Sequence, residues 1–494
     1  MHAATHSRDL YTVEQVRTLD RRAIDELGIT AFELMSRAAA TALTCLCQRW
    51  PQARRIVVFC GPGNNGGDGY LLASFAQGAG MGVEVVELSE ALHGDANGAR
   101  ATWQRSEGLS HRWHQDASLP KADVYVDALY GTGLNRAPDP SGAALIERIN
   151  ASGIPVLALD VPSGLNADTG NCPGAAIQAQ CTVSFIAAKR GLYTGQAPTR
   201  VGGLQIDKLG LPDLLWQGMQ ADACLLESMH LPARARDAHK GDNGHVLAIG
   251  GDHGTAGAIR LCGEAALRCG AGLVSVATRG ENLFALNSAR PELMAHAVHG
   301  PQELQSLLER ASVLAVGPGL GQGAWGHALW LTALDSGKPL VLDADGLNLL
   351  AHEPHRFAAP AVLTPHPGEA ARLLATTTPD VQRDRFAAAR ELARRYGAVI
   401  VLKGSGSLIA NPDGRIDVCT WGNPGMASGG MGDLLTGVIA ALLAQGCTAW
   451  DAARMGVGLH ARAGDMAARG GERGLLASDL LAPLRALGNG LGHD

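Results

Sequence analysis

Short apolar runs alternate with helix-length segments through the first half of the chain. Before the first run, residues 12–50 predict two helices, the first with Thr12 as its N-cap. A further helix is expected at residues 70–77. The apolar runs predict buried strands at residues 55–60, 83–88, 124–129, 156–159 and 182–186. Short buried strands separated by helical segments are typical of an α/β domain with a parallel sheet.

The second half repeats this rhythm. Helices are predicted at residues 256–269 and 434–443, and strands at residues 244–249, 273–277, 313–316, 340–342, 361–363 and 399–402. Between the halves, residues 211–240 carry prolines and charges without a strong period. A chain of 494 residues has room for two or three domains of about 100–200 residues. We predict one domain at residues 1–226 and a second at residues 227–494.

The overall composition narrows the class of protein. The chain is 46% hydrophobic and 18% charged, which allows sizeable cores, and its net charge of −6 without a Lys/Arg block argues against nucleic-acid binding. Ten cysteines without a Cys-x-x-Cys pair favour buried reduced thiols over a structural zinc site. Residues 1–10 lack an apolar signal core, and the apolar stretch at residues 434–444 is shorter than the ~20 residues that span a bilayer. We therefore expect a cytoplasmic protein without a membrane segment.

A glycine-rich sequence follows the first predicted strand. Residues 61–69 read Gly-Pro-Gly-Asn-Asn-Gly-Gly-Asp-Gly and lead into a predicted helix. We expect the five glycines to permit positive φ angles and to clear the path of a ligand, while the helix N-terminus attracts an anion. The spacing matches neither Gly-x-Gly-x-x-Gly nor a Walker loop. A tight turn without a ligand is the alternative, but two asparagines and an aspartate favour a binding site.

Two more polar loops end predicted strands in this half. Residues 127–134 read Asp-Ala-Leu-Tyr-Gly-Thr-Gly-Leu, and residues 160–166 read Asp-Val-Pro-Ser-Gly-Leu-Asn. Ligands of open α/β sheets bind outside the carboxyl ends of the strands, so the three loops are predicted to converge. Asp160 is the candidate acid/base residue, because a carboxyl group can exchange protons with a hydroxyl or ring nitrogen. Its alternative role is to cap the loop, and Lys189 is a secondary candidate for the site or for a phosphate.

The second half has a glycine-rich sequence of its own before its apolar helix. Residues 423–433 read Asn-Pro-Gly-Met-Ala-Ser-Gly-Gly-Met-Gly-Asp. Backbone N–H groups of the Gly-x-Gly-Asp ending can form an anion hole, and Asp433 at the helix entrance can take a proton from an attacking hydroxyl. The alternative is that Asp433 only caps the helix.

Three other loops in this half carry candidate groups. Residues 403–407, Lys-Gly-Ser-Gly-Ser, follow a predicted strand with N–H and hydroxyl donors for a nucleotide phosphate. His366 lies between two prolines in a loop at a strand end, which favours a binding role over a structural one. Asp343 and Asp345 follow another strand, where they could position Mg²⁺ or a loop.

The first half resembles the NAD(P)H-hydrate epimerase family over about residues 10–220. The matching motifs are Asn-Asn-Gly-Gly-Asp, Asp…Gly-Thr-Gly and Asp-x-Pro-Ser-Gly, in family order. The resemblance implies a Rossmann-like three-layer α/β/α domain and a K⁺ site at Asn65, Asp127 and Ser163, whose oxygen atoms suit a hard cation. It implies contacts to the hydrated nucleotide from Asn64, Asn65, Gly66, Gly67, Asp68, Gly131, Thr132, Gly133, Leu134, Asn135, Arg136, Ala137 and Asp160.

The second half resembles the ribokinase-like fold through Gly-x-Gly-Asp, over about residues 228–490. Three further matches shift the resemblance to the ADP/ATP-dependent NAD(P)H-hydrate dehydratase family: residues 240–251, 317–321 and 364–369. The resemblance implies that the adenine nucleotide contacts Lys403, Gly404, Ser405, Gly406, Ser407 and Gly432. It implies that the hydrated cofactor contacts Ala258, Gly319, His366 and Asp433.

Together the two resemblances imply a bifunctional metabolite-repair enzyme. The first half would interconvert the R and S forms of hydrated NADH and NADPH (NADHX and NADPHX). The second would restore NAD(P)H from the S form by phosphorylating its hydroxyl and eliminating phosphate, with Asp433 as base. ADP with Mg²⁺ is the expected donor and ATP the alternative, and the family resemblance implies a homo-oligomer. The competing hypothesis is a vitamin or sugar kinase of ribokinase-like fold with a non-catalytic, nucleotide-binding N-terminal module.

Overall fold

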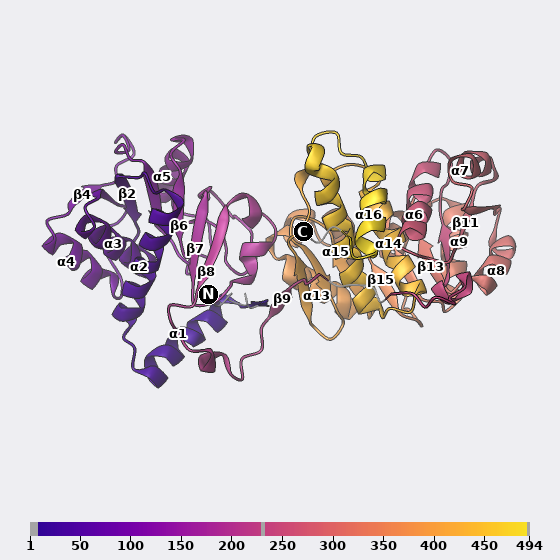
Figure 1. Cartoon of the computed structure of the whole chain (residues 1–494), viewed down its shortest axis with the longest axis horizontal. Coiled ribbons are helices and arrows are strands. Elements are labelled where there is room, and N and C mark those ends of the chain that lie inside the picture. Colours follow the sequence, from indigo (N-terminus) through magenta and orange to yellow (C-terminus); the bar gives the residue numbers. More distant parts are fainter. Residues whose placement is uncertain (1–7, 229–232, 492–494) are drawn as a thin grey trace. The chain divides into compact units, whose positions relative to one another are not determined.

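The protein is described by a computed structural model that covers residues 8–228 and 233–491. It divides into two compact units, Met1–Ala223 and Cys224–Asp494, near the predicted boundary (Figure 1). Part of the predicted linker, residues 229–232, lies outside the described residues, as do residues 1–7 of the segment in which no signal core was found. Among the described helices, none is long and apolar enough to cross a membrane.

The first unit is built on a parallel sheet. Its strands lie in the order β4-β3-β2-β5-β6-β7-β8, and every neighbouring pair is parallel. The chain runs from β2 outward to β4 and then returns to the other side of β2 at β5, so the order reverses between β2 and β5. The strands of this unit are β1 (Asp9–Leu10), β2 (Arg55–Cys60), β3 (Gly82–Glu87), β4 (Leu109–Arg112), β5 (Val124–Ala128), β6 (Val156–Leu159), β7 (Cys181–Phe185) and β8 (Gly203–Asp207).

Alternate side chains of the central strands enter two different cores. Ile56 and Val58 of β2 pack in one apolar cluster, and Val57 and Phe59 pack in another. Because successive strand side chains point to opposite faces, both faces of this sheet are buried. This is the physical reason that the strand reads as a continuous apolar run in the sequence.

The helices of the first unit begin close to their sequence signals, with one exception. Thr12 caps the first helix and forms the predicted capping box with Gln15. The third helix begins at Asn64 rather than at the predicted residue 70, so the Asn-Asn-Gly-Gly-Asp motif lies in its first turns. The helices are α1 (Val13–Leu27), α2 (Ala31–Arg49), α3 (Asn64–Gly78), α4 (Ala96–Arg105), α5 (Pro140–Ala151), η1 (Arg190–Tyr193), η2 (Ala197–Thr199) and η3 (Asp213–Trp216).

The second unit is also built on one sheet. Its strands lie in the order β9-β18-β17-β16-β15-β14-β13-β10-β11-β12, parallel from β16 to β12, with β17 antiparallel to both of its neighbours. The order reverses between β10 and β13. The strands are β9 (Ala223–Leu225), β10 (His245–Ile249), β11 (Leu273–Thr278), β12 (Met294–Ala297), β13 (Val313–Val316), β14 (Leu340–Leu342), β15 (Ala361–Leu363), β16 (Val399–Leu402), β17 (Ser407–Ala410) and β18 (Ile416–Cys419).

The most apolar helix of this unit lies inside it. Helix α14 begins at Met431, three residues before the predicted start, and its apolar side chains from Leu434 to Leu442 are buried in the main core. The helices are α6 (Ala256–Arg268), α7 (Leu283–Ala289), α8 (Pro301–Arg310), α9 (Ala324–Asp335), α10 (Ala344–His352), α11 (Pro367–Leu374), α12 (Thr378–Arg383), α13 (Arg385–Tyr396), α14 (Met431–Ala444), α15 (Ala449–Ala467) and α16 (Leu481–Gly488), with short 3-10 helices η4 (Lys240–Asn243), η5 (Gly280–Asn282), η6 (Pro424–Met426), η7 (Ala468–Gly470) and η8 (Ala477–Leu480).

Candidate active sites

The three polar loops of the first unit leave the same edge of its sheet. They follow β2, β5 and β6, which are adjacent and parallel, so their carboxyl ends lie together. This edge includes the point between β2 and β5 where the strand order reverses, which is where α/β sheets bind ligands.

The glycines of the first loop allow close packing of the backbone and do not adopt unusual backbone angles. None of the five in residues 61–69 has a positive φ, so the expected conformational role is wrong. A Cβ at Gly61 would lie 1.7 Å from the Leu129 carbonyl oxygen, and one at Gly66 would lie 2.0 Å from the Gly61 carbonyl oxygen. The motif therefore lets the loop after β2 pack against Leu129, which follows β5, and lets the start of α3 pack against that loop, although glycine disfavours a helix.

Asp127 and Ser163 form a buried polar pair between two of these loops. The Ser163 hydroxyl lies 2.6 Å from Oδ1 of Asp127, and the Ser163 N–H donates to Oδ2 at 2.8 Å. The Ser163 hydroxyl also accepts from the Tyr130 N–H at 2.8 Å. Burial raises the pKa of Asp127 to about 6, so a cation beside this carboxylate would stabilise its charged form.

Asn65 is the buried amide of this edge. It is 8% exposed, and neither its side-chain oxygen nor its side-chain nitrogen has a hydrogen-bond partner. An amide this deeply buried is normally hydrogen-bonded, so its atoms are suited to a bound ion or ligand. Gly131 separates it from Asp160, because a Cβ at Gly131 would lie 3.2 Å from the Asn65 Cβ and 3.3 Å from Asp160 Oδ2.

Asp160 forms an ion pair with Lys189. The Lys189 ammonium, on a side chain only 1% exposed, donates to Asp160 Oδ1 at 2.6 Å. It also donates to the Ser184 hydroxyl at 2.9 Å and to the Phe185 carbonyl at 2.7 Å. Asp160 has a φ of +62°, an uncommon backbone angle for a residue with a side chain. These contacts hold one carboxylate oxygen and leave Oδ2 facing Gly131.

Two further carboxyl groups interact with this ion pair. Burial raises the pKa of Asp20, on α1, to about 6, with Lys189 lowering it and Asp160 raising it. Burial and the charges of Asp160 and Asp20 raise the pKa of Asp68 well above its usual range. Sequence reasoning missed Asp20, although it lies four residues after Val16 and three before Ala23, on the apolar face of α1, where a carboxyl group is unusual.

The remaining predicted binding residues form a loop above these groups. It connects β5 to α5, and the Thr132 N–H points to Asp160 Oδ2 at 3.4 Å. Leu134 is half-buried, whereas the others of the loop's second part are exposed: Gly133, Asn135, Arg136 and Ala137. The loop therefore has surface available to a ligand.

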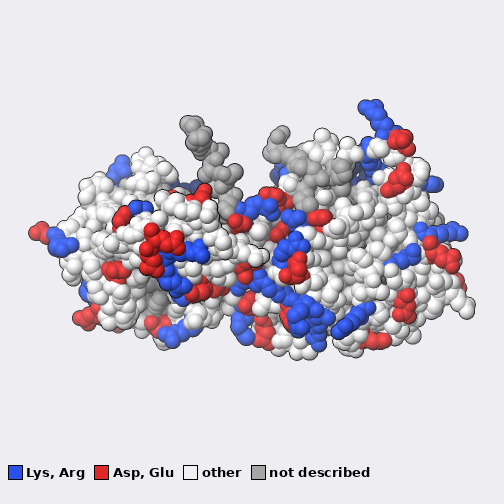
Figure 2. Space-filling model, turned by 90° about the horizontal axis from the view of Figure 1, so that it is seen from below, with Lys and Arg blue, Asp and Glu red and all other residues white. Residues whose placement is uncertain are grey.

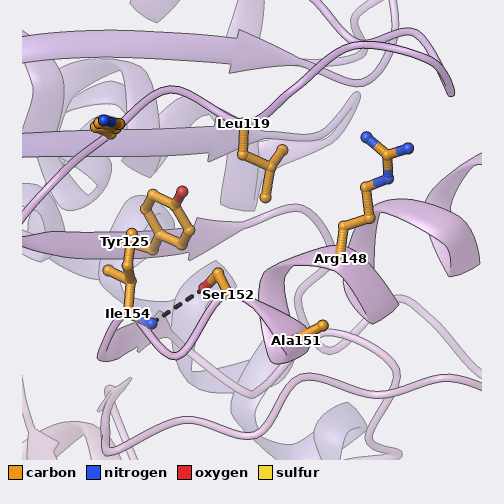
Figure 3. A pocket seen from close by; sticks show the side chains of 7 residues that line it. Leu119, Tyr125, Arg148, Ala151, Ser152 and Ile154 are labelled. Carbon is orange, nitrogen blue, oxygen red and sulfur yellow. Dashed lines mark hydrogen bonds between the residues drawn. The ribbon is translucent and has the colours of Figure 1, made fainter.

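A hollow of about 340 Å³ lies elsewhere on this unit (Figure 3). Its lining includes Tyr125 of β5, Ile154 just before β6, and Ser152, whose hydroxyl accepts from the Ile154 N–H at 3.1 Å. These residues lie at the amino ends of the strands. The hollow is thus separate from the edge that carries Asp127 and Asp160.

In the second unit, the loops after β10 and β13 contact each other. The Gly251 N–H donates to the Pro318 carbonyl at 3.1 Å, and the Thr255 hydroxyl donates to the Gly319 carbonyl at 2.8 Å. Ala258 lies one turn along, with its N–H bonded to the Thr255 carbonyl. The structure thereby brings the predicted Ala258 and Gly319 to one place at the point of strand-order reversal.

A buried ion pair joins the loops after β14 and β16. The Lys403 ammonium donates to Asp343 Oδ1 at 2.8 Å, and the Thr436 hydroxyl donates to Asp343 Oδ2 at 2.8 Å. Burial opposes ionisation of Asp343, but Lys403 and Thr436 lower its pKa overall. Asp345, the other candidate for Mg²⁺ or a loop, accepts from the Gly321 N–H at 2.9 Å and so holds the loop after β13.

Asp433 lies in the first turn of α14, beside this ion pair. Burial and the negative charge of Asp343 raise its pKa to about 6, while Lys403 lowers it. The preceding residue, Gly432, has no room for a side chain without crowding the pair, since a Cβ there would lie 3.2 Å from the Lys403 Nζ. A carboxyl with this pKa is a base at neutral pH and is close to the range that favours proton transfer.

His366 and Glu369 form the N-terminus of α11. The Nδ1 atom of His366 accepts from the Gly368 N–H at 3.0 Å, while the Glu369 carboxylate accepts from the His366 N–H at 2.8 Å. His366 therefore has a structural capping role as well as a side chain that is half exposed. Burial raises the pKa of Glu369 to about 7, and its carboxylate is 4.0 Å from the Lys403 ammonium.

The predicted nucleotide loop is short and internally bonded. The Gly404 N–H donates to the Ser407 hydroxyl at 3.2 Å, and that hydroxyl donates to the Gly404 carbonyl at 2.9 Å. The Lys403 N–H donates to the Pro365 carbonyl at 2.9 Å, which ties this loop to the one that carries His366. The loops after β10, β13, β14, β15 and β16 thus all lie at one edge of the sheet.

Two family models match the chain, one in each unit. The model described as "YjeF-related protein N-terminus" matches residues 31–191, and the model described as "NAD(P)H-hydrate dehydratase" matches residues 246–485. The bifunctional NAD(P)H-hydrate repair enzyme of Coxiella burnetii is 48% identical over 97% of this chain and 99% of its own length. The chain belongs to the bifunctional NAD(P)H-hydrate repair enzyme family. The Escherichia coli member is 45% identical, over 97% of this chain and 94% of its own.

Membership of this family agrees with the predicted pairing of two α/β domains. A solved ADP/ATP-dependent NAD(P)H-hydrate dehydratase from Bacillus subtilis, co-crystallised with ATP and Mg²⁺, is 30% identical to this chain. It covers 52% of this chain and 93% of its own, with a TM-score of 0.48.

On the face in Figure 2, acidic and basic side chains are interspersed over each unit.

Proposed function

We propose that the chain is a bifunctional enzyme that repairs hydrated NADH and NADPH. In this proposal the first unit interconverts the R and S forms, and the second dehydrates the S form at the expense of ADP. The chain is 48% and 45% identical to two bifunctional repair enzymes over 97% of its length, which supports both activities on one chain. The kinase hypothesis is not supported, because the second-unit family model is that of the dehydratase rather than of a vitamin or sugar kinase.

In the first unit, Asp160 is the proposed proton-transfer residue. Its Oδ1 is held by the Lys189 ammonium, which orients the carboxylate, while Oδ2 faces the loop that carries Thr132. Asp68 and residues 131–137 would bind the nucleotide beside it. A carboxylate held in one orientation can take the proton of the hydroxyl while the bond between the hydrated carbon and the ring nitrogen breaks. It can return that proton after the bond re-forms on the other face of the carbon, which inverts its configuration.

We propose that K⁺ binds at Asn65, Asp127 and Ser163. The partnerless buried amide of Asn65 and the buried carboxylate of Asp127 are hard oxygen donors of the kind that K⁺ prefers. When bound, K⁺ would supply positive charge to this edge of the sheet. Asn65 would then turn its carbonyl oxygen toward the ion.

In the second unit, Asp433 is the proposed base. It would take the proton of the substrate hydroxyl as that oxygen attacks the terminal phosphorus of ADP, and AMP leaves as the P–O bond to it breaks. Elimination of the resulting phosphate ester restores the ring double bond and releases inorganic phosphate. Residues 403–407 and Gly432 would hold the nucleotide, and Ala258, Gly319 and His366 the hydrated cofactor. Mg²⁺ bound with ADP would neutralise phosphate charge.

The observation that carries this proposal is the position of Asp433. A carboxylate with a pKa of about 6 lies in the first turn of a buried helix, beside the Lys403–Asp343 ion pair. The test follows the recovery of reduced-nicotinamide absorbance from mixed epimers with ADP or ATP, together with phosphate release. One phosphate per restored NADH is expected. Dehydration without nucleotide consumption would contradict the mechanism.

Three further properties of the protein are part of the proposal. We propose that the enzyme forms a homo-oligomer, as the resemblance implied, and that it acts in the cytoplasm. We also propose that ADP rather than ATP is the preferred donor. Comparing kcat/KM for the two nucleotides with pure S-form substrate tests the last point, and light scattering tests the oligomeric state.

A further inference from the structure

A buried guanidinium lies behind the Lys403–Ser407 loop. Arg385, the first residue of α13, is 1% exposed. Its Nη2 donates to the Leu402 carbonyl at 3.2 Å, and to the carbonyls of Lys403 and Gly406 at 3.4 Å each. Its Nη1 donates to the Gln382 side chain at 3.0 Å. One cation therefore binds three backbone carbonyls at the end of β16 and in the loop that follows.

The path of the loop is adapted to this side chain. Gly404 has a φ of +138°, and a Cβ there would lie 3.0 Å from the Arg385 Nη1. Gly406 also has a positive φ, of +61°, so both glycines adopt angles that other residues avoid. Ser407 closes the turn through its two hydrogen bonds with Gly404. The two glycines thus allow the backbone to wrap around the guanidinium.

The charge of this group persists at neutral pH. Burial lowers the pKa of Arg385 to about 10, which still leaves the guanidinium protonated under physiological conditions. A positive charge beneath a loop in a water-poor environment attracts an anion above the loop more strongly than a solvated charge does. Carbonyls that point toward the cation also keep their negative ends away from that anion.

We propose that Arg385 is a positioning residue of the nucleotide site, which holds the carbonyls of the 403–407 loop inward and presents a positive environment to the diphosphate of ADP. The inference rests on the proposed role of this loop in nucleotide binding. Arg385 acts through the loop, so it affects the binding of the ADP phosphates rather than the binding of the hydrated cofactor.

The test compares two Arg385 variants with a matched control in the full-length enzyme. Arg385→Met removes the charge and its hydrogen bonds, and Arg385→Lys keeps the charge with fewer donors. The control is Arg395→Met on the same helix, whose guanidinium donates to the Leu373 carbonyl at 2.8 Å, away from the loop. We expect Arg385→Met to raise the KM for ADP roughly tenfold or more, with a smaller rise for Arg385→Lys. The KM for S-NADHX and the epimerase rate should change less than twofold.

The phosphate dependence separates positioning from general destabilisation. Direct binding of AMP, ADP and ATP to Arg385→Lys and Arg385→Met should show a loss of affinity that grows with phosphate number. Equal rises in the KM for ADP and for S-NADHX, or an unchanged KM for ADP in folded Arg385→Lys, would overturn the proposal. The Lys variant decides the question even where Arg385→Met fails to fold.

A loop variant distinguishes this inference from the function on which it rests. Ser407→Ala removes the hydroxyl that closes the loop and should weaken ADP binding if the loop holds the nucleotide. An unchanged ADP affinity in Ser407→Ala would remove the nucleotide role of the loop, and the role of Arg385 with it. Weakened binding in Ser407→Ala but not in the Arg385 variants would overturn only the positioning role.

Discussion

The ammonium of Lys189 lies 2.6 Å from the carboxylate of Asp160, at the carboxyl edge of the first sheet. The two residues come from loops after adjacent strands, β6 and β7. The Lys189 ammonium has three N–H groups, and it donates hydrogen bonds to Asp160, Ser184 and Phe185. It therefore has no further N–H group for a ligand. Its position suits the orientation of Asp160 better than the direct phosphate contact that the sequence also allowed.

Replacing Asp160 tests the epimerase assignment directly. Asp160→Asn removes the proton-accepting group and should lower the epimerisation rate about 10²–10⁴-fold, while dehydration of pure S-NADHX is unchanged. The two rates are measured separately, by epimer ratio and by absorbance recovery. Full epimerase activity in this variant would mean that another group moves the proton.

Replacing Lys189 should lower the stability of the first unit. Lys189→Met leaves the Asp160 carboxylate without its partner, and breaking a buried pair costs about 3–5 kcal/mol of unfolding free energy. Denaturant unfolding measures that loss. Lys208→Met is the control, since Lys208 pairs with Asp213 at an exposed position and should change stability by less than about 1 kcal/mol.

The dehydratase should depend on pH through Asp433. As a base, this carboxyl must be ionised, so kcat/KM for S-NADHX should fall as pH drops below about 6, tenfold per pH unit, and level off above it. Asp433→Asn should reduce the rate about 10²–10⁴-fold above pH 6 and should remove the fall in rate below it. Asp451→Asn is a matched control, because Asp451 occupies the first turn of the neighbouring helix α15. A wild-type profile flat through pH 6 would rule out this assignment.

The contact at Gly131 predicts a steric effect. A methyl group there would lie 3.2 Å from Asn65 and 3.3 Å from Asp160, so Gly131→Ala should displace one of them and lower epimerase activity roughly tenfold, or about 1.4 kcal/mol in transition-state stabilisation. Gly78→Ala, on α3 with no atom within 4 Å of the added Cβ, should have no effect. Equal activities in the two variants would contradict the placement of Gly131 between the two side chains.

The proposed K⁺ site predicts a link between K⁺ and Asn65. Replacing K⁺ by a smaller cation such as Li⁺ should reduce epimerase activity in the wild type, because Asn65 and Asp127 are held by the fold at fixed positions. Asn65→Leu should be slow in both salts and insensitive to the exchange. Epimerisation is measured at constant ionic strength, and a wild-type enzyme indifferent to K⁺ would argue against this site.

Apolar runs in the sequence predicted the buried strands with accurate bounds. The strands at residues 156–159, 313–316, 340–342, 361–363 and 399–402 have the predicted bounds. Their alternate side chains enter cores on both faces, which forces an unbroken apolar run. The edge strands β4 and β8 were not predicted, because they are short and carry many half-buried or exposed positions.

Helix starts show where local reasoning fails. The sequence placed residues 64–69 in a loop because glycine disfavours helices, yet they form the first turns of α3. The deciding interaction is the approach of Gly61 and Gly66 to backbone atoms that a side chain would exclude. The constraint on Gly61 comes from Leu129, which follows β5 and lies more than sixty residues away, whereas Gly66 packs against Gly61 itself.

The sequence by itself determined the two α/β halves, the strand-end loops and the motifs that carry the chemistry, because hydrophobic period and loop composition are local properties. Only the tertiary structure decided which charges meet. It paired Asp160 with Lys189 and Asp343 with Lys403, added Asp20 to the first group, and placed Arg385 behind the loop of residues 403–407. Such pairings depend on the order of strands in a sheet, which brings together residues far apart in the chain.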